Sequence, residues 1–372
     1  MNLPEISVII PTFNRWETLL QSLLALKKQT FDASTYEIIV VNDGSTDNAY
    51  AGMGRCDEIG IPNLKHLNQK KNGPGSARNL GIRHAKGRIL LFLGDDIIVS
   101  ENLLEEHFLF HSEKFKGKNF ACLGYVTWPL SFCPTPFLQF LESWGQFLFE
   151  NISDGEELDY NYFYSSNISL KKIFLDEKDL LFDEDFKEAA WEDIEFGYRG
   201  EKEGLKIIFN RNAVGFHNHC QTLESAINRM GTSGRSLFVL LKKWPELAKK
   251  FGFLKTERGY IARHKLIKGI LRNKLSIVAI MEVLKLLDKT IIPEQDINEN
   301  RQDRSIPQTD RRGFLTPQKE SNPLSPPLIK RGQEGIITAI KRPNKLLKVI
   351  YKNILLYYLQ RGFEEAQQNW QT

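Results

Sequence analysis

Residues Gly87–Asp96 read GRILLFLGDD, an apolar run that stops at a glycine and two adjacent carboxylates. Uninterrupted strand-forming residues are typical of a strand buried on both faces of a sheet. Ligands of open α/β sheets bind beyond the carboxyl ends of the strands, so Asp95 and Asp96 are well placed for chemistry. Two neighbouring carboxylates repel each other unless a cation or donors compensate them, and hard oxygen ligands suit Mg²⁺ or Mn²⁺. An isolated Gly-Asp-Asp, however, is more often a solvated turn.

The composition is that of an ordinary soluble globular protein. The chain has 372 residues, of which 41% are hydrophobic and 26% are charged. A net charge of +4 is too small to indicate nucleic-acid binding. The cysteines form no Cys-x-x-Cys pair, so we expect reduced core thiols and no zinc site. With no signal peptide and no uncharged stretch of about 18 residues, we expect a cytoplasmic protein that does not cross a membrane.

Strand and helix patterns alternate through the first hundred residues. Apolar strand runs occupy residues 6–10, 36–41 and 63–67, and helical spacing of apolar residues occupies residues 16–28 and 77–85. A weaker helical pattern follows Asp47. This alternation predicts a parallel sheet covered by helices on both faces.

Polar segments follow these strands and precede the next helices. They are PTFNR at 11–15, NDGSTD at 42–47 and PGSARN at 74–79. Asp-Gly alone is usually a turn, Gly-Pro-Gly alone is usually a helix start, and neither standard glycine-rich phosphate loop is present. Three polar strand ends beside an acidic pair nevertheless favour a nucleotide pocket.

These segments resemble glycosyltransferase family 2. The resemblance rests on SVIIPTFNR at 7–15, VVNDGSTD at 40–47 and GSARNLG at 75–81, in the order and spacing of that family. It covers roughly residues 5–220 and implies an α/β fold of the GT-A type, a mostly parallel sheet flanked by helices, that binds a nucleotide sugar. By position, the resemblance implies that Thr12 and Asp43 contact the base, and that Pro11 and Arg78 belong to the nucleotide pocket.

The family's Asp-x-Asp metal motif falls at Gly94–Asp96, where Gly94 replaces the first acid. The resemblance implies that Asp96 coordinates a divalent cation, Mg²⁺ or Mn²⁺, and that Asp95 contacts the ribose or a metal-bound water. It also implies a histidine ligand downstream. His217 matches that position better than His219, although a lone histidine is most often structural.

The middle of the chain is expected to form the acceptor side. Residues 119–127 and 162–170 are predicted strands, and residues 137–149 form a helical pattern rich in aromatic side chains. Large aromatics at helical spacing are usually core, and the alternative is a platform for an acceptor sugar.

A cluster of acids opens the next predicted helix, in FKEAAWEDIEFGYR at 186–199. Acids at a helix start also satisfy the helix dipole. Displacement at an anomeric carbon, however, needs a carboxylate to accept the proton of the acceptor hydroxyl. The segment resembles the family's Glu-Asp motif, which assigns that role to Asp193, with Glu192 as a helper or second candidate.

The resemblance fades beyond about residue 222. We expect a glycosyltransferase domain over 1–221, a helical basic extension over 222–290, a flexible linker or insertion over 291–343 and an amphipathic helix over 344–372. The last helix carries Lys345, Lys348 and Lys352 along one face. Such a helix either packs on the enzyme or lies on an anionic membrane surface from the cytoplasmic side.

Together these observations predict a metal-assisted inverting glycosyltransferase of cell envelope polysaccharide biosynthesis. It would move a sugar from a nucleotide-diphosphate sugar to a saccharide or lipid-linked saccharide. A catalytically inactive nucleotide-sugar-binding or scaffold protein is the alternative, because Gly94 replaces a motif acid. A sugar-phosphate nucleotidyltransferase is disfavoured, because the glycine-rich start and lysine of that class are absent. The sequence leaves the sugar, the linkage and the oligomeric state open.

Overall fold

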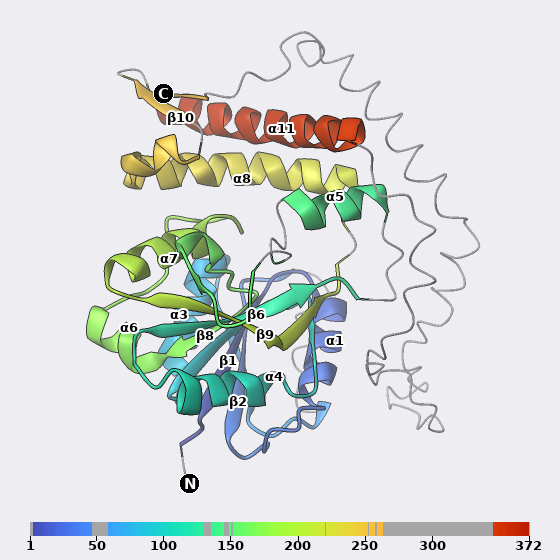
Figure 1. Cartoon of the computed structure of the whole chain (residues 1–372), viewed down its shortest axis with the longest axis vertical. Helices are drawn as coiled ribbons and strands as arrows, with labels where there is room; N and C mark the ends of the chain where they lie inside the picture. The colour runs from blue at the N-terminus through green and yellow to red at the C-terminus, as the bar shows by residue number, and fades with distance from the viewer. Residues whose placement is uncertain are drawn as a thin grey trace, which may run out of the picture.

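A computed structural model describes residues 3–46, 59–129, 135–144, 149, 152–219, 221–251, 253–256, 259–262 and 345–371. Figure 1 shows an α/β body around a central sheet, with a layer of helices packed beyond one end of it. Within the described residues, the main sheet has the strand order β3-β2-β1-β4-β8-β6-β9-β5, and β7 pairs with β9. Its strands are β1 (Ile6–Thr12), β2 (Tyr36–Asn42), β3 (Leu64–Asn68), β4 (Ile89–Leu93), β5 (Ile97–Val99), β6 (Phe120–Thr127), β7 (Glu157–Leu158), β8 (Asn167–Lys171) and β9 (Lys206–His217).

The helices flank the sheet or form the outer layer. They are α1 (Trp16–Leu26), α3 (Pro74–His84), α4 (Leu103–Leu109), α5 (Pro136–Trp144), α6 (Lys172–Lys178), α7 (Glu192–Lys202), α8 (Leu223–Lys243) and α11 (Lys345–Gln371). A π-helical turn at Phe110–Lys114 and 3₁₀ turns at Tyr160–Tyr162 and Pro245–Lys249 complete the helical segments that the structure describes.

The first half of the sheet is parallel, as the alternating pattern predicted. Strands β3, β2, β1 and β4 pair in parallel, and every residue of β2 and β4 is buried. Side chains of these strands, together with apolar residues of α1 and α3, form one continuous hydrophobic core. Burial on both faces explains why these strands read as uninterrupted apolar runs. The predicted α/β class, with helices flanking a large sheet, is confirmed.

Beyond β4 the sheet becomes mixed. Strand β8 is antiparallel to both β4 and β6, whereas β6 and β9 run parallel. Strand β8 begins at Asn167, so the strand predicted over 162–170 starts too early. Residues 160–162 instead form a 3₁₀ turn, because the side chain of Asp159 accepts a hydrogen bond from the backbone N–H of Asn161 and caps that turn.

The aromatic segment after residue 136 is core. Phe137 and Phe140 on α5 are buried and contact Tyr351 of α11, with ring centroids 5.1 and 5.4 Å apart. Phe149 is stacked on Phe209 in the main core, 5.2 Å between centroids. These three rings are therefore packing residues and no acceptor platform. The side chains of Trp144 and Phe147 lie outside what the structure describes.

Helix α11 packs on α8 and α5, and Figure 1 shows the two long helices side by side above the sheet. Two glycines allow this close approach. A Cβ on Gly234 would lie 2.0 Å from the backbone oxygen of Leu359, and a Cβ on Gly362 would lie 2.0 Å from that of Gly231. The predicted C-terminal helix therefore packs on the rest of the protein.

The basic extension is only partly helical where it is described. Helix α8 begins after Thr222, which forms a capping box with Ser225. Residues 253–256 and 259–262 form the antiparallel hairpin β10–β11, where a helical extension was predicted. The remainder of that extension, the predicted linker, and the predicted helix after Asp47 lie outside the described residues.

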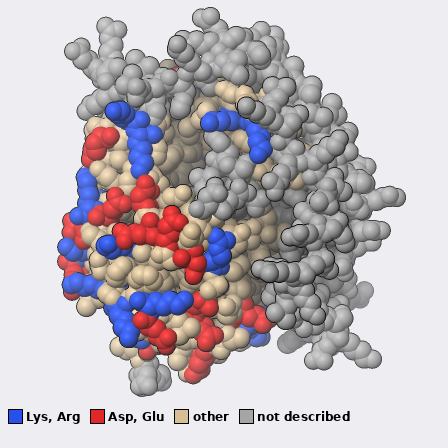
Figure 2. All heavy atoms as spheres, viewed as in Figure 1, with Lys and Arg blue, Asp and Glu red and all other residues tan. Residues whose placement is uncertain are grey.

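Acidic and basic side chains intermingle on the face shown in Figure 2. This agrees with the small net charge of +4. Among the helices that the structure describes, none combines the length and the apolarity needed to span a bilayer. The described cysteine, Cys122, is buried and has a free thiol, as predicted.

Candidate active site

The ends of β1 and β2 are joined by the polar residues that follow them. The backbone N–H of Asp43 donates to the carbonyl of Thr12, continuing the β1–β2 pairing, which also places Pro11 beside Val41. Asn14 adopts a left-handed conformation with φ of 54°. Its side chain accepts a hydrogen bond from the backbone N–H of Thr46. The two segments therefore form a single polar edge at the carboxyl end of the parallel strands.

Asp43 organises the loop that leads into α3. Its Oδ1 accepts hydrogen bonds from Gln69 Nε2 at 2.7 Å and the backbone N–H of Asn72 at 2.8 Å, and its Oδ2 accepts from the N–H of Gly73 at 2.9 Å. Gly73 has φ of 96°, and a Cβ there would lie 2.7 Å from the backbone oxygen of Phe186. The predicted base-contacting carboxylate is therefore also a structural anchor.

The acidic pair lies at the end of β4 and is mostly buried. Asp95 is 7% exposed and Asp96 is 8% exposed. Nη1 of Arg15 bridges them, 3.0 Å from Asp95 Oδ1 and 2.7 Å from Asp96 Oδ2. Thr12 Oγ1 donates to Asp95 Oδ2 at 2.8 Å, and Ser22 Oγ donates to the Asp95 carbonyl. The structure thus places Thr12, Asp95 and Asp96 together, as predicted, and adds Arg15.

His217 completes this cluster from the end of β9. Its Nε2 lies 3.3 Å from Asp96 Oδ2, because β9 pairs with β5 directly after the acidic pair. Burial alone would raise the pKa of Asp96, but the contacts with His217 and Arg15 outweigh it and lower that pKa. Burial, followed by the charge of Asp96, raises the pKa of Asp95 to about 6. The Asp96 carboxylate is the kind of oxygen ligand that Mg²⁺ and Mn²⁺ prefer, and the imidazole beside it could add a nitrogen ligand. Among the described residues, no group of three or more His, Cys, Asp or Glu side chains could hold a metal ion, so a bound cation would need further oxygen ligands from outside the protein.

Arg78 points toward the acids of α7. Its Nη1 lies 2.9 Å from Glu192 Oε1, and both residues are buried, 7% and 4% exposed. Nε of Arg78 is buried without a hydrogen-bond partner among the described residues. The guanidinium also lies 5.3 Å from the ring centroid of Phe182. The predicted nucleotide-pocket arginine and the predicted Glu-Asp motif therefore meet, although they are more than a hundred residues apart in sequence.

Asp193 follows Glu192 in the first turn of α7. Its Oδ1 accepts the backbone N–H of Ile194 at 2.8 Å, and its Oδ2 lies 3.5 Å from both the backbone nitrogen and Oγ of Ser165. Burial and then the charge of Glu192 raise the pKa of Asp193 to about 6. A carboxylate with a raised pKa is a better proton acceptor than an ordinary one, and it is still ionised at neutral pH.

Strand β8 connects Asp193 to the acidic pair. In the β4–β8 pairing Leu93 lies opposite Asn167, and the next N–H, of Gly94, donates to the carbonyl of Ser166 at 3.1 Å. Ser165, which contacts Asp193, immediately precedes that residue. The two predicted acidic motifs consequently lie on the same edge of the sheet. The sequence predicted a strand here whose polar residues could face the sugar, but it did not indicate the contact between Ser165 and Asp193.

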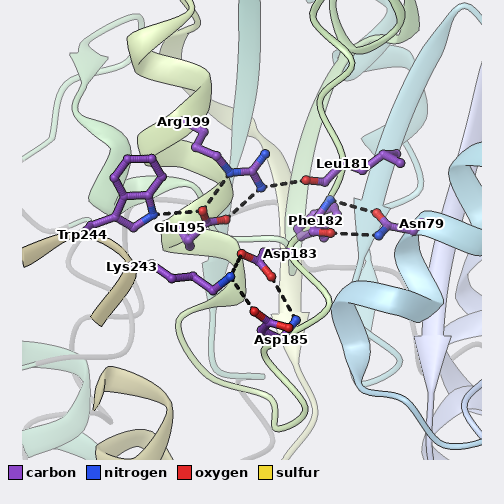
Figure 3. A network of polar contacts seen from close by, with 9 residues as sticks. All are labelled: Asn79, Leu181, Phe182, Asp183, Asp185, Glu195, Arg199, Lys243 and Trp244. Atoms are coloured by element: carbon purple, nitrogen blue, oxygen red, sulfur yellow. Dashed lines mark hydrogen bonds and ion pairs between the residues drawn. The ribbon is translucent and has the colours of Figure 1, made fainter. Parts of the chain in front are cut away.

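A second set of contacts anchors the segment that precedes α7. Figure 3 shows Arg199 donating to Glu195 and to the Leu181 carbonyl, and Trp244 donating to the same carboxylate. In the same view Lys243 contacts two further acids, Asp183 and Asp185. A cavity of about 370 Å³ beside these residues is lined by none of the predicted site residues. This network holds the segment leading to Glu192 and Asp193 against α8.

Comparison with known proteins supports the family resemblance. Residues 7–122 match the family model for glycosyl transferase family 2. This range of the chain includes Thr12, Asp43, Arg78, Asp95 and Asp96. Over these residues the chain is similar to glycosyl transferase family 2. The predicted resemblance is confirmed.

Three relatives illustrate the range of similarity. An uncharacterized glycosyltransferase, YfnE of Bacillus subtilis, is 25% identical over 265 residues, 59% of this chain and 67% of YfnE. Glycosyltransferase AglE of Haloferax volcanii is 38% identical over 28% of this chain and 34% of AglE. TarS of Staphylococcus aureus, a poly(ribitol-phosphate) beta-N-acetylglucosaminyltransferase, is 31% identical over 30% of this chain and 21% of TarS. The match to an uncharacterized glycosyltransferase of Rickettsia bellii spans only 15% of that protein.

Solved structures with a similar fold include glycosyltransferases with bound donors. S. aureus TarS 1–349 in complex with UDP-GlcNAc aligns with a TM-score of 0.48 and 20% identity, over 63% of this chain and 66% of that one. The mannosyltransferase PcManGT from Pyrobaculum calidifontis, in complex with GDP-Man and Mn²⁺, aligns with a TM-score of 0.46 and 17% identity, over 65% of each chain.

Proposed function

We propose that this protein is a metal-assisted, inverting glycosyltransferase that moves a sugar from a nucleoside-diphosphate sugar to a hydroxyl group of a saccharide or lipid-linked saccharide. The observation that carries the proposal is the convergence of Asp193 and Asp96 on one sheet edge through Ser165 and Ser166. The family match over residues 7–122 supports the class of reaction.

In the proposed reaction, Asp193 accepts the proton of the acceptor hydroxyl. The freed oxygen forms a bond to the anomeric carbon of the donor sugar while the bond from that carbon to the diphosphate breaks. Attack from the face opposite the leaving group inverts the anomeric configuration. The pKa of about 6 suits Asp193 to this role at neutral pH, because the side chain is then ionised and still basic.

The other site residues bind and orient the donor. Pro11, Thr12 and Asp43 lie at the strand ends expected to receive the base. Arg78 holds Glu192 in place beside Asp193 through their ion pair. Asp96 and His217 would hold a divalent cation, which supplies charge stabilisation for the departing diphosphate.

A thermal-shift screen tests donor binding directly. UDP-GlcNAc, UDP-glucose, UDP-galactose and GDP-mannose are each added with and without Mn²⁺. A donor at about 100 times its dissociation constant stabilises the fold by about 2.7 kcal/mol, a shift of several degrees. We expect one donor to raise the melting temperature in a Mn²⁺-dependent way. D96N should lose this dependence, and D176N, which alters an exposed carboxylate paired with Lys172, should keep it. No shift with any donor would contradict the proposal.

A further inference from the structure

Arg15 occupies the position between the two carboxylates at the end of β4. A single nitrogen, Nη1, lies within hydrogen-bonding distance of both Asp95 Oδ1 and Asp96 Oδ2. Both acids are more than nine-tenths buried. Two adjacent buried carboxylates repel each other strongly unless a positive charge lies between them. Arg15 supplies that charge.

The guanidinium of Arg15 also disfavours binding of a metal cation to Asp96. A divalent ion bound to Asp96 Oδ2 would approach the guanidinium at close range, since that oxygen is already 2.7 Å from Arg15 Nη1. Coulomb repulsion between positive charges at such separations is strong in a partly buried site. The guanidinium and a metal ion therefore compete for this carboxylate oxygen.

The side chain of Arg15 is partly open to solvent. Its residue precedes the first turn of α1, outside regular secondary structure. The Arg15 side chain is 36% exposed, in contrast to the buried acids that it contacts. The neighbouring backbone is held independently, by the hydrogen bond from the N–H of Asn14 to Ser45 Oγ. Movement of this side chain consequently requires no change in the strands.

We propose that Arg15 is a resident counter-ion that is exchanged for the divalent metal, and that this exchange couples metal binding to arrival of the donor. The inference rests on the proposed function, because it takes Asp96 as the metal ligand. A diphosphate offers the displaced guanidinium strong, bidentate hydrogen bonds. Metal alone must displace Arg15 without compensation and binds weakly. Metal together with a diphosphate binds tightly, because Arg15 then pairs with phosphate oxygens.

Mn²⁺ binding in the absence of nucleotide tests this proposal, measured from the free-ion signal in electron paramagnetic resonance. R15M removes the competing charge and should bind Mn²⁺ at least tenfold more tightly than the wild type. R15K keeps a positive charge and should stay within about threefold of the wild type. R88M is the matched control, because Arg88 pairs with Glu5 at the start of β4, whereas the acidic pair follows the end of that strand. It should leave the affinity unchanged.

The D96N change in the R15M background separates the inference from the function on which it rests. Loss of the tight Mn²⁺ binding in R15M/D96N supports the exchange at Asp96. Equal, Asp96-dependent affinity in R15M and wild type would overturn the counter-ion role and leave the metal site intact. Absence of any Asp96-dependent binding in both proteins would overturn both the inference and the metal assistance. Melting temperatures of all variants confirm that each one is folded.

Discussion

Arg78 Nη1 lies 2.9 Å from Glu192 Oε1, and this buried ion pair joins the start of α3 to the start of α7. The two residues come from different sequence motifs, one at the expected nucleotide pocket and one at the expected acceptor base. Their contact fixes the first turn of α7, which carries Asp193, against α3. The pair therefore helps to position the carboxylate on which the proposed reaction depends.

Breaking this ion pair on one side should be strongly destabilising. R78M and E192L each leave one buried charge without its partner, which costs about 3–5 kcal/mol in comparable pairs. The double variant R78M/E192L should be more stable than either single change, because no unpaired charge remains. Urea unfolding of the four proteins measures this coupling. Additive losses in the double variant would show that the two charges do not interact.

Replacement of Asp193 should stabilise the fold at neutral pH. Its pKa is about 6 in the folded protein and about 3.9 in an unfolded chain, so the folded state binds the proton more tightly. The destabilisation caused by the ionised Asp193 side chain is therefore absent below about pH 4 and fully present above pH 6. We expect D193N to gain about 1–3 kcal/mol at pH 8 and nothing at pH 4, measured by denaturant unfolding.

Asp159 provides a control of opposite sign. Burial would raise its pKa, but hydrogen bonds from Asn161 and the charge of Lys250 outweigh burial and lower that pKa. D159N should therefore destabilise the protein at pH 8. A D193N gain that persists at pH 4 would contradict the assignment of the raised pKa.

Two buried histidines should make the fold sensitive to mild acid. His107 Nδ1 lies 2.8 Å from Ser169 Oγ and His111 Nε2 lies 2.9 Å from the same oxygen. Burial lowers the pKa of His107 to about 4 and that of His111 to about 3. Between pH 6.5 and 4 the unfolded chain binds protons that the folded protein does not.

As the pH is lowered through that range, the free energy of unfolding should decrease by up to about 1.4 kcal/mol per pH unit for each histidine. H107Q/H111Q should be less stable than the wild type at pH 8, since it disturbs a buried network, but should lose less stability between pH 7 and pH 5. Parallel stability curves for the two proteins over this interval would show that the histidines are not the groups responsible.

The close packing of α8 and α11 should depend on Gly234. A methyl group there would overlap the Leu359 carbonyl, so G234A must push α11 away, at a cost of about 1–3 kcal/mol. Gly231 lies one turn earlier on α8, and its Cβ would meet only the end of the Arg235 side chain at 3.8 Å. G231A should therefore be neutral or stabilising by up to about 1 kcal/mol, through helix propensity.

Hydrogen exchange of the backbone amides of α11 measures the effect. G234A should accelerate exchange throughout this helix, and G231A should not. Equal protection in the two variants would mean that the helices tolerate a wider separation than the glycines suggest. Sedimentation with anionic vesicles, before and after deletion of residues 344–372, tests whether this docked helix also contacts a membrane.

The sequence predicted the parallel part of the fold well, because its signals are local. Burial on both faces leaves uninterrupted apolar runs such as Ile89–Leu93, and the polar residues that follow each strand mark the site edge. The start of β8 was missed because the aromatic residues at 160–164 look like a strand, whereas Asp159 caps a turn there.

The sequence pattern could not predict contacts between residues that are far apart in the chain. Arg15 is about 80 residues from the acids that it bridges, and nothing in its own segment indicates them. The docking of α11 depends on a pair of glycines whose role appears only when both helices are in place. The hydrogen bond from Gly94 to Ser166, which brings the acidic motifs together, similarly depends on antiparallel pairing of strands far apart in sequence.

The proposed role of Asp193 is tested most directly by turnover of the donor that the thermal-shift screen identifies. Release of nucleoside diphosphate in the presence of Mn²⁺ is compared for wild type, D193N and D176N, alongside the dissociation constant of the donor. A general base contributes about 10²–10⁴ to the rate, so D193N should lower kcat at least a hundredfold and leave donor affinity within threefold. D176N should match the wild type. Turnover by D193N at the wild-type rate would contradict the account.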